Sequence, residues 1–270
     1  MGNPFSYEAK RVVVTGAYSG VGAALVELLA ELGAAHITVL DIKKPAGPVD
    51  LYLETNLGDE AAVRAAIDEI VGPVDVLFNN AGVAATQPRS VVMSVNYLAL
   101  RTLSERLLEK IPAGGAIANT ASIAGGQWPA HLPDITELLA IDGWEESLAW
   151  VEAHPDLTAD PYSFSKECVQ VYTMRSSRTT MTRHVRINSV CPAPIDTPLL
   201  VDFNATMTEK VMSWTVQQSG GTIATPMDIA RALAFLGADA SSYVNGVNLN
   251  VDGGFTAGLT TGQLDFSGLA

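Results

Sequence analysis

The chain has 270 residues, of which 48% are hydrophobic, and its 16 basic and 29 acidic side chains give a formal net charge of -13. This length suits one α/β domain of generous size, and the acidic balance argues against nucleic acid or an anionic membrane as a partner. Two cysteines are too few for a disulfide framework. Together with the lack of a signal-peptide pattern, they favour a cytoplasmic protein.

Strands and helices are predicted to alternate along the chain. Short apolar, β-branched runs indicate strands, and apolar residues at helical spacing indicate helices. The predicted strands are 11–16, 36–41, 50–56, 74–79, 116–121, 185–191 and 247–251, and the predicted helices include 20–33, 59–71, 91–110 and 226–236. This order predicts a single domain, 1–270, with a doubly wound parallel sheet covered on both faces. Such sheets bind ligands beyond the carboxyl ends of their strands.

A glycine-rich turn joins the first strand to the first helix. It spans 15–22 (TGAYSGVG). Its glycines allow backbone N–H groups at a helix N-terminus to approach a pyrophosphate. A plain strand–helix connector has a similar composition, so the turn alone is a weak signal. Asp41 ends the second strand and strengthens the signal for a dinucleotide site. A carboxylate at this position binds the ribose 2′-hydroxyl of NAD and repels a 2′-phosphate.

Tyr162 and Lys166 stand four residues apart, just after Asp160 and Pro161. Proline is favourable at a helix start, and on a helix the two side chains lie on one face, one turn apart. An adjacent ammonium group lowers the pKa of a Tyr from its usual value of about 10. Such a Tyr exchanges a proton with an alcohol oxygen near neutral pH. A solvated helix face would give the same spacing, so the pair needs support from the rest of the chain.

Taken together, these motifs resemble the short-chain dehydrogenase/reductase family over essentially the whole chain. The resemblance rests on the glycine turn, the NNAG run at 79–82, Ser122, Tyr162-x-x-x-Lys166, Asn188 before Pro192, Thr197 and the DGG run at 252–254. It implies a Rossmann fold and transfer of a hydride between a nicotinamide and a carbonyl or alcohol. It also implies a homo-oligomer, with dimer and tetramer left open.

The resemblance implies roles for particular residues. Ser122 is expected to hydrogen-bond the substrate oxygen, and Tyr162 to exchange the proton with it. Lys166 is expected to lower the Tyr162 pKa and bind the nicotinamide ribose, and Asn96 to anchor a water that relays protons from Lys166. No metal is expected. The expected NAD site combines Tyr162 and Lys166 with Gly16, Tyr18, Ser19, Gly20, Val21, Gly22, Asp41, Asn56, Leu57, Asn80, Ala81, Gly82, Pro192, Ile195 and Thr197.

Two single residues depart from the family pattern. Ala193 stands where the family usually has Gly, which puts the backbone path of the nicotinamide loop in question. Asn56 stands where the family often has an Asp that contacts the adenine amino group. Its amide oxygen can still accept that hydrogen bond.

The largest departure is an insertion at about 125–160, before the Tyr–Lys helix. It is predicted to hold two short helices, 134–141 and 144–153, and resembles a bacterial subgroup of 3α-hydroxysteroid dehydrogenase/carbonyl reductases. The insertion and the expected substrate loop, 196–225, together contain Trp128, Trp144, Trp150 and Trp214. Trp on both sides of the reaction centre indicates an apolar, ring-containing substrate. An inserted helical pair also needs a core of its own, so both explanations stay open.

The resulting hypothesis is an NAD-dependent oxidoreductase acting on a hydrophobic secondary alcohol or ketone, with hydroxysteroids and bulky cyclic ketones as leading substrates. One alternative is a dehalogenase-like relative that has lost the nucleotide, against which Gly16, Gly20, Gly22 and Lys166 argue. A second is a non-catalytic dinucleotide sensor, against which the Tyr–Lys pair argues.

Overall fold

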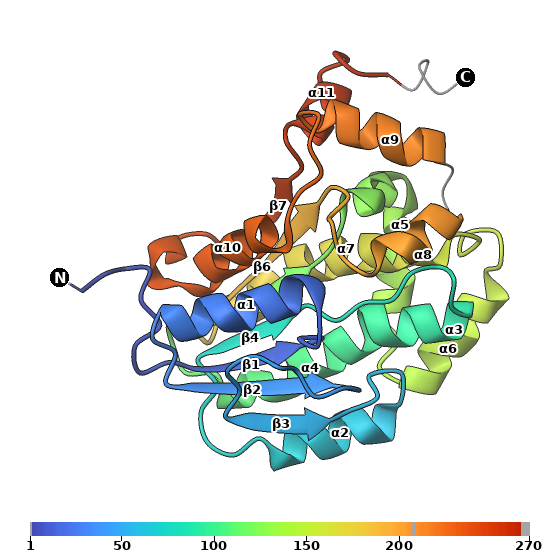
Figure 1. Ribbon diagram of the computed structural model, residues 1–270. Helices are drawn as coiled ribbons and strands as arrows, with labels where there is room; N and C mark the ends of the chain where they lie inside the picture. Colours follow the sequence, from blue (N-terminus) through green and yellow to red (C-terminus); the bar gives the residue numbers. More distant parts are fainter. Residues whose placement is uncertain (1, 207–208, 266–270) are drawn as a thin grey trace.

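The computed structural model describes residues 2–206 and 209–265. Within these residues seven parallel strands form a sheet in the order β3-β2-β1-β4-β5-β6-β7 (Figure 1). The strands are β1 (Arg11–Thr15), β2 (His36–Asp41), β3 (Leu51–Glu54), β4 (Val76–Asn79), β5 (Ala116–Thr120), β6 (Arg186–Pro192) and β7 (Asn248–Val251). The strand order reverses direction between β1 and β4, which is where doubly wound sheets bind their ligands.

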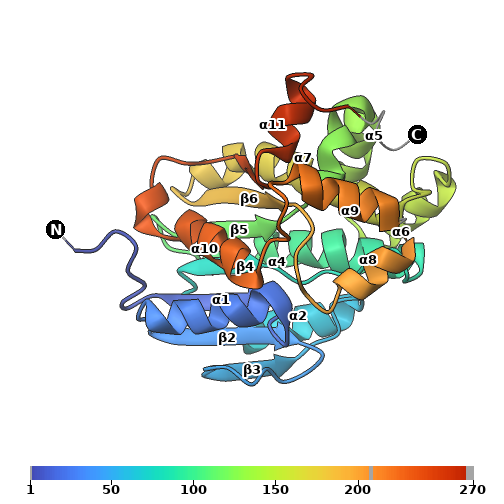
Figure 2. The ribbon, with the colours of Figure 1, turned by 45° about the horizontal axis from the view of Figure 1, so that its top comes forward.

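Helices cover both faces of this sheet (Figures 1 and 2). On one face α1 (Gly20–Glu31) packs beside α10 (Pro226–Gly237), and on the other lie α2 (Glu60–Glu69), α4 (Ala99–Leu107) and α7 (Pro161–Met181). The remaining helices are α3 (Arg89–Met93), α5 (Trp128–Leu139), α6 (Trp144–Ala153), α8 (Leu200–Thr206), α9 (Glu209–Gln218) and α11 (Phe255–Thr260). The predicted doubly wound fold is confirmed. Among the described residues, no helix is long and apolar enough to cross a membrane.

The sheet separates two apolar cores. Successive side chains of a strand point to opposite faces. Val12 and Val14 therefore pack with α1 and α10, whereas Val13 packs on the side of α4 and α7. Because both faces are buried, these strands read in the sequence as continuous apolar runs instead of alternating ones.

The helix predicted over 91–110 is not uniform. It begins as α3, passes through a π-helical turn over Ser94–Leu98, and continues as α4 and a 3-10 turn over Leu108–Lys110. In the π-helical turn the Ala99 N–H bonds the carbonyl of Ser94, five residues back. One extra residue per turn changes the direction of the side chains, and such turns are common at functional sites. This turn carries Asn96.

The insertion forms two helices, as predicted, but the first begins earlier. α5 starts at Trp128 and not at 134, with Pro129 in its first turn and Pro133 inside the helix. Pro133 has no N–H for the helical hydrogen-bond pattern, yet α5 runs through it. A 3-10 turn over Ile123–Gln127 leads from the end of β5 into α5.

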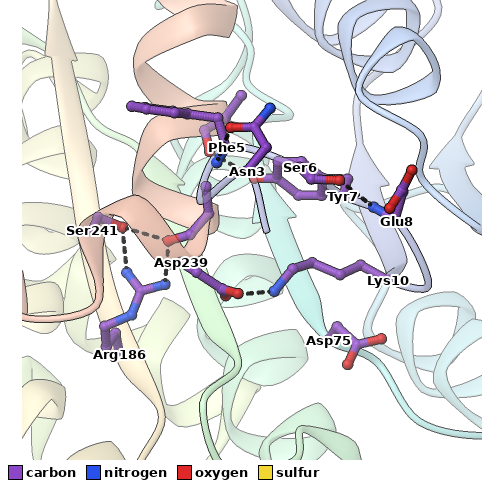
Figure 3. A network of polar contacts seen from close by, with 12 residues as sticks. Asn3, Phe5, Ser6, Tyr7, Glu8, Lys10, Asp75, Arg186, Asp239 and Ser241 are labelled. Carbon is purple, nitrogen blue, oxygen red and sulfur yellow. Dashed lines mark hydrogen bonds and ion pairs between the residues drawn. The ribbon is translucent and has the colours of Figure 1, made fainter. Parts of the chain in front are cut away.

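The N-terminal segment is fastened to the end of α10 (Figure 3). The hydroxyl of the fully buried Tyr7 donates to the Ala234 carbonyl at 2.7 Å. Arg186, at the start of β6, donates to the carbonyls of Leu236 and Ala238 at 2.7 and 3.1 Å. Carbonyls in the last turn of a helix lack partners further along it, so Arg186 supplies a donor to the Leu236 carbonyl. The Ala234 carbonyl also accepts the Ala238 N–H at 3.0 Å. This network lies near the amino ends of the strands, whereas the candidate site lies at their carboxyl ends.

Candidate active site

The four candidate catalytic residues come from three elements that meet at the carboxyl end of β5. Ser122 follows β5, Asn96 lies in the π-helical turn, and Tyr162 and Lys166 lie in the first two turns of α7. Asp160 caps α7 by accepting hydrogen bonds from the backbone N–H groups of Tyr162 and the next residue, at 3.1 and 3.2 Å. The cap fixes the helix start and therefore the height of Tyr162 above the sheet.

Lys166 is buried, and its ammonium group donates to the Thr120 carbonyl at 2.8 Å. The ammonium nitrogen lies 5.7 Å from the centre of the Tyr162 ring, so the two side chains share one face of α7 as predicted. Burial lowers the pKa of Lys166 to about 8, because removal from water disfavours the charged form.

Tyr162 is protonated at neutral pH in this environment. Burial raises its pKa to about 12, and a hydrogen bond with Ser122 is the main influence that lowers it. The sequence predicts that Lys166 lowers this pKa, whereas in the structure Ser122 does so. The Lys166 ammonium is bonded to the Thr120 carbonyl and is itself disfavoured by burial, so it does not offset the desolvation of Tyr162.

The Ser122 hydroxyl is oriented by its own backbone. Its oxygen accepts the Ala124 N–H at 3.1 Å, which leaves the hydroxyl hydrogen for Tyr162 or for a substrate oxygen. Cys191, on the neighbouring strand β6, is buried beside these residues, and burial raises the pKa of its thiol to about 12. The thiol is therefore neutral and adds no charge to the site.

Asn96 is almost fully buried and joins two segments of the chain. Its amide nitrogen donates to the Val83 carbonyl and the Ser165 hydroxyl, both at 3.0 Å, and its amide oxygen accepts the Val83 N–H at 2.8 Å. A Cβ on Gly82 would lie 3.4 Å from that oxygen and 3.5 Å from the Lys166 ammonium nitrogen. Asn96, Gly82 and Lys166 are therefore neighbours.

The glycine turn is closed tightly at the ends of β1 and β4. Gly16 and Gly20 have φ angles of +69° and +59°, which favour glycine. A Cβ on Gly22 would overlap the Gly16 carbonyl, to which the Asn80 amide donates at 2.9 Å. A Cβ on Gly20 would lie 3.1 Å from the Thr197 methyl group. The glycine turn and the loop after β6, which is predicted to contact the nicotinamide, are therefore adjacent.

Thr15 is a site residue for which the sequence suggests no separate role. Its hydroxyl oxygen accepts the backbone N–H groups of both Asn80 and Ala81 at 3.0 Å. A Cβ on Gly16 would come within 2.6 Å of the Ala81 Cα. Thr15 thus holds the end of β1 close to the segment that follows β4. In the sequence, its position directly before Gly16 in the glycine turn could have indicated this role.

Asp41 lies beside the glycine turn, as predicted. The residue is 8% exposed, and its two carboxylate oxygens accept the backbone N–H groups of Tyr18 and Lys43 at 2.9 and 3.0 Å. Each oxygen keeps a free lone pair for a ribose hydroxyl. The Lys43 ammonium nitrogen lies 5.0 Å from the centre of the exposed Tyr18 ring, in a cation–π contact.

The other predicted cofactor residues also lie at the carboxyl ends of the strands. They are Ser19 and Val21 at the start of α1, Asn56 and Leu57 after β3, and Pro192 and Ile195 at and after the end of β6. The Asn56 side-chain oxygen accepts the Gly58 N–H at 3.0 Å, so it forms a local turn besides any contact with adenine. Among described non-glycine residues, positive φ occurs at Ala9 and His184. The backbone at Ala193 therefore needs no glycine.

Two of the four Trp residues form the core of the insertion. Trp144 and Trp150 are 6% and 8% exposed. Trp150 stacks on His154 with ring centres 3.9 Å apart, and its indole N–H donates to Glu137 at 2.9 Å. These contacts favour the local-core explanation for both residues. Trp128 packs partly buried on the same core, and Trp214 packs edge-on against Phe255, with ring centres 5.6 Å apart.

The aromatic residue that contacts Tyr162 is Phe203 of α8. The ring centres are 4.8 Å apart, and the rings meet edge to face at 68°. The neighbouring Asp202 accepts a hydrogen bond from the Thr86 hydroxyl at 3.3 Å, which ties α8 to the loop after β4. Sequence reasoning missed Phe203, because a single Phe in a short helix belongs to no motif and no long apolar pattern.

Comparison with known proteins gives two family matches. A model described as short chain dehydrogenase matches residues 10–133, and one described as enoyl-(acyl carrier protein) reductase matches residues 147–256. The stretch between them, 134–146, lies within the insertion.

Individual relatives match the chain almost from end to end. Coniferyl-alcohol dehydrogenase from a Pseudomonas species is 33% identical, covering 92% of this chain and 97% of that protein. Cis-4-hydroxycyclohexanecarboxylate dehydrogenase from Sinomonas cyclohexanicum is 34% identical, covering 95% and 100%. The crystal structure of 3-alpha-hydroxysteroid dehydrogenase from a Pseudomonas species, complexed with NADH, has a TM-score of 0.76 at 29% identity and covers 95% and 100%. The chain therefore belongs to the short-chain dehydrogenase family and is an oxidoreductase that acts on CH–OH groups.

Proposed function

We propose that the protein is an NAD-dependent dehydrogenase of hydrophobic, ring-containing alcohols, interconverting a secondary alcohol and its ketone. The observation that carries the proposal is the meeting of Ser122, Tyr162 and Lys166 at the end of β5, beside the glycine turn and Asp41. The similarity to a steroid dehydrogenase complexed with NADH supports the choice of cofactor.

In ketone reduction, Ser122 and Tyr162 hold the substrate oxygen by hydrogen bonds. When bound at the glycine turn, NADH would supply the hydride for the carbonyl carbon. Tyr162 gives its proton to the oxygen, and its pKa of about 12 keeps that proton in place until it is needed. In alcohol oxidation Tyr162 must lose its proton before it can accept one from the alcohol. The hydrogen bond with Ser122, which lowers the Tyr162 pKa, stabilises the resulting phenolate.

The preference for NAD follows from Asp41. Its buried carboxylate is held by the N–H groups of Tyr18 and Lys43, so it cannot swing away from a ribose bound at the glycine turn. NADP would bring a phosphate with close to two negative charges against it. Like charges at hydrogen-bonding distance cost about 1 kcal/mol in water and about four times as much near a protein surface. Ser19 occupies the turn position at which a cation would relieve this repulsion.

A ring-containing substrate is supported by Phe203 and by the relatives. The Phe203 edge on the Tyr162 ring makes an apolar wall next to the reacting oxygen. The relatives named above are dehydrogenases of coniferyl alcohol, of a hydroxycyclohexane carboxylate and of a 3α-hydroxysteroid, all of which contain six-membered rings.

We expect Tyr162→Phe to abolish most of the activity and to spare cofactor binding. The substitution removes the proton donor and keeps the ring that packs on Phe203. General acid–base catalysis contributes about 10²- to 10⁴-fold, so kcat for ketone reduction should fall by at least that lower factor. Absorbance of the reduced nicotinamide measures the rate, and fluorescence titration with NADH measures binding. Near wild-type turnover would show that another group moves the proton.

We expect the unmodified protein to prefer NAD over NADP by at least about tenfold in kcat/KM, a difference of about 1.4 kcal/mol. Asp41→Ala should lower kcat/KM with NAD and reduce the difference in kcat/KM between NAD and NADP. Lys43→Ala serves as the matched control, since it removes a cation next to the same pocket and should leave the NAD preference in place. Comparable kcat/KM with both cofactors in the unmodified protein would mean that Lys43 outweighs the carboxylate.

We expect Phe203→Ala to raise KM for a ring-containing alcohol about 5- to 10-fold more than KM for a small acyclic alcohol, because an aromatic contact contributes about 0.5–1.5 kcal/mol beyond burial. Trp150→Phe is the control: Trp150 lies in the core of the insertion, so any effect should be alike for both substrates. If Phe203→Ala changed both KM values by the same factor, Phe203 would not be part of the substrate site.

A further inference from the structure

Gln170 lies on the same face of α7 as the Tyr–Lys pair, one turn past Lys166. The residue is buried, and its side-chain nitrogen donates to the Ser122 carbonyl at 2.8 Å. The same carbonyl accepts the Gly125 N–H at 3.1 Å. Both lone pairs of the Ser122 carbonyl are therefore occupied, one by α7 and one by the turn that follows β5.

The turn after Ser122 is pressed directly against α7. A Cβ on Gly125 would lie 2.7 Å from the side-chain nitrogen of Gln170 and 2.7 Å from the backbone carbonyl carbon and oxygen of Lys166. Glycine permits this approach, and a larger residue would push the turn off the helix. The turn is thus held at one distance from the backbone that carries the catalytic residues.

The Ser122 hydroxyl depends on the position of this turn. Its oxygen accepts the N–H of Ala124, two residues ahead, and its hydrogen bond with Tyr162 lowers the Tyr162 pKa. A shift of this turn would move the Ala124 N–H away from the Ser122 hydroxyl oxygen and free the hydroxyl to leave Tyr162. The Gln170 amide holds the Ser122 carbonyl.

We propose that Gln170 is a positioning residue for Ser122: by holding the Ser122 carbonyl from α7, it keeps the Ser122 hydroxyl directed at Tyr162 and at the substrate oxygen. The proposal rests on the proposed function, in which Ser122 and Tyr162 bind that oxygen. One helix then sets both partners of the proton transfer, because α7 carries Tyr162, Lys166 and Gln170. In this role Gln170 acts through the Ser122 carbonyl and not on the substrate oxygen itself.

A double-mutant cycle tests this role. Gln170→Met removes the amide donor and keeps an unbranched side chain of similar length. In the unmodified protein we expect kcat to fall about 10-fold or more, since small displacements of a catalytic group have large effects on rate. In a Ser122→Ala background the same substitution should change kcat by less than about twofold, because residues that act as a unit are not additive. KM for NADH should stay within about twofold throughout.

The pH profile gives a second readout. Loss of the hydrogen bond from Ser122 raises the Tyr162 pKa, so in Gln170→Met the rate of alcohol oxidation should reach its half-maximum at higher pH than in the unmodified protein. Tyr7→Phe is the control. It deletes a buried hydrogen bond from a side chain to a helix carbonyl, on the far side of the molecule, and should move neither kcat nor the pH profile.

Equal losses from Gln170→Met in the unmodified and Ser122→Ala backgrounds, with no shift in pH profile, would overturn the proposal and assign Gln170 to helix packing alone. Full activity of Ser122→Ala or Tyr162→Phe would instead overturn the proposed function, and the role of Gln170 with it. If Gln170→Met does not fold, as judged by circular dichroism, Gln170→Asn shortens the same side chain by one methylene group. It should show the same dependence on Ser122.

Discussion

The site depends on the burial of a charged group, the Lys166 ammonium, against the Thr120 carbonyl at the end of β5. A buried charge needs a hydrogen-bond partner, and here the partner is a backbone carbonyl whose direction is set by β5. The bond fixes α7 along its axis and thereby places Tyr162 beside Ser122. The turn that carries Ser122 is fixed to the same helix through Gln170. Strand, turn and helix therefore position one another.

Burial also separates the properties of the two titrating groups. It raises the pKa of Tyr162 to about 12 and lowers that of Lys166 to about 8, so near neutral pH the phenol keeps its proton and the amine keeps its charge. This is the state that the proposed ketone reduction requires. The proposed oxidation requires the phenolate, which the hydrogen bond with Ser122 stabilises. In the proposed mechanism the rates of oxidation and reduction therefore depend on pH through these two buried side chains.

The sequence predicts the fold, because buried parallel strands give continuous apolar runs, and it places the proposed site residues at strand ends or on the helices that follow, where the structure brings them together. It does not predict the π-helical turn that carries Asn96, since one extra residue barely alters a helical pattern. The source of the Tyr162 pKa shift depends on burial in three dimensions, which spacing does not reveal. Phe203 and Gln170 make contacts between distant segments and belong to no motif. A homo-oligomer and a cytoplasmic location stay predictions.

The rate of hydride transfer in a single turnover, measured in both directions as a function of pH, tests the central claim most directly. If the buried Tyr162 moves the proton, alcohol oxidation should become faster from about pH 6 to about pH 8, because the fraction of phenolate grows. Ketone reduction should stay level over the same range, because Tyr162 stays protonated. An oxidation rate that does not change with pH would contradict proton transfer by a Tyr with a raised pKa.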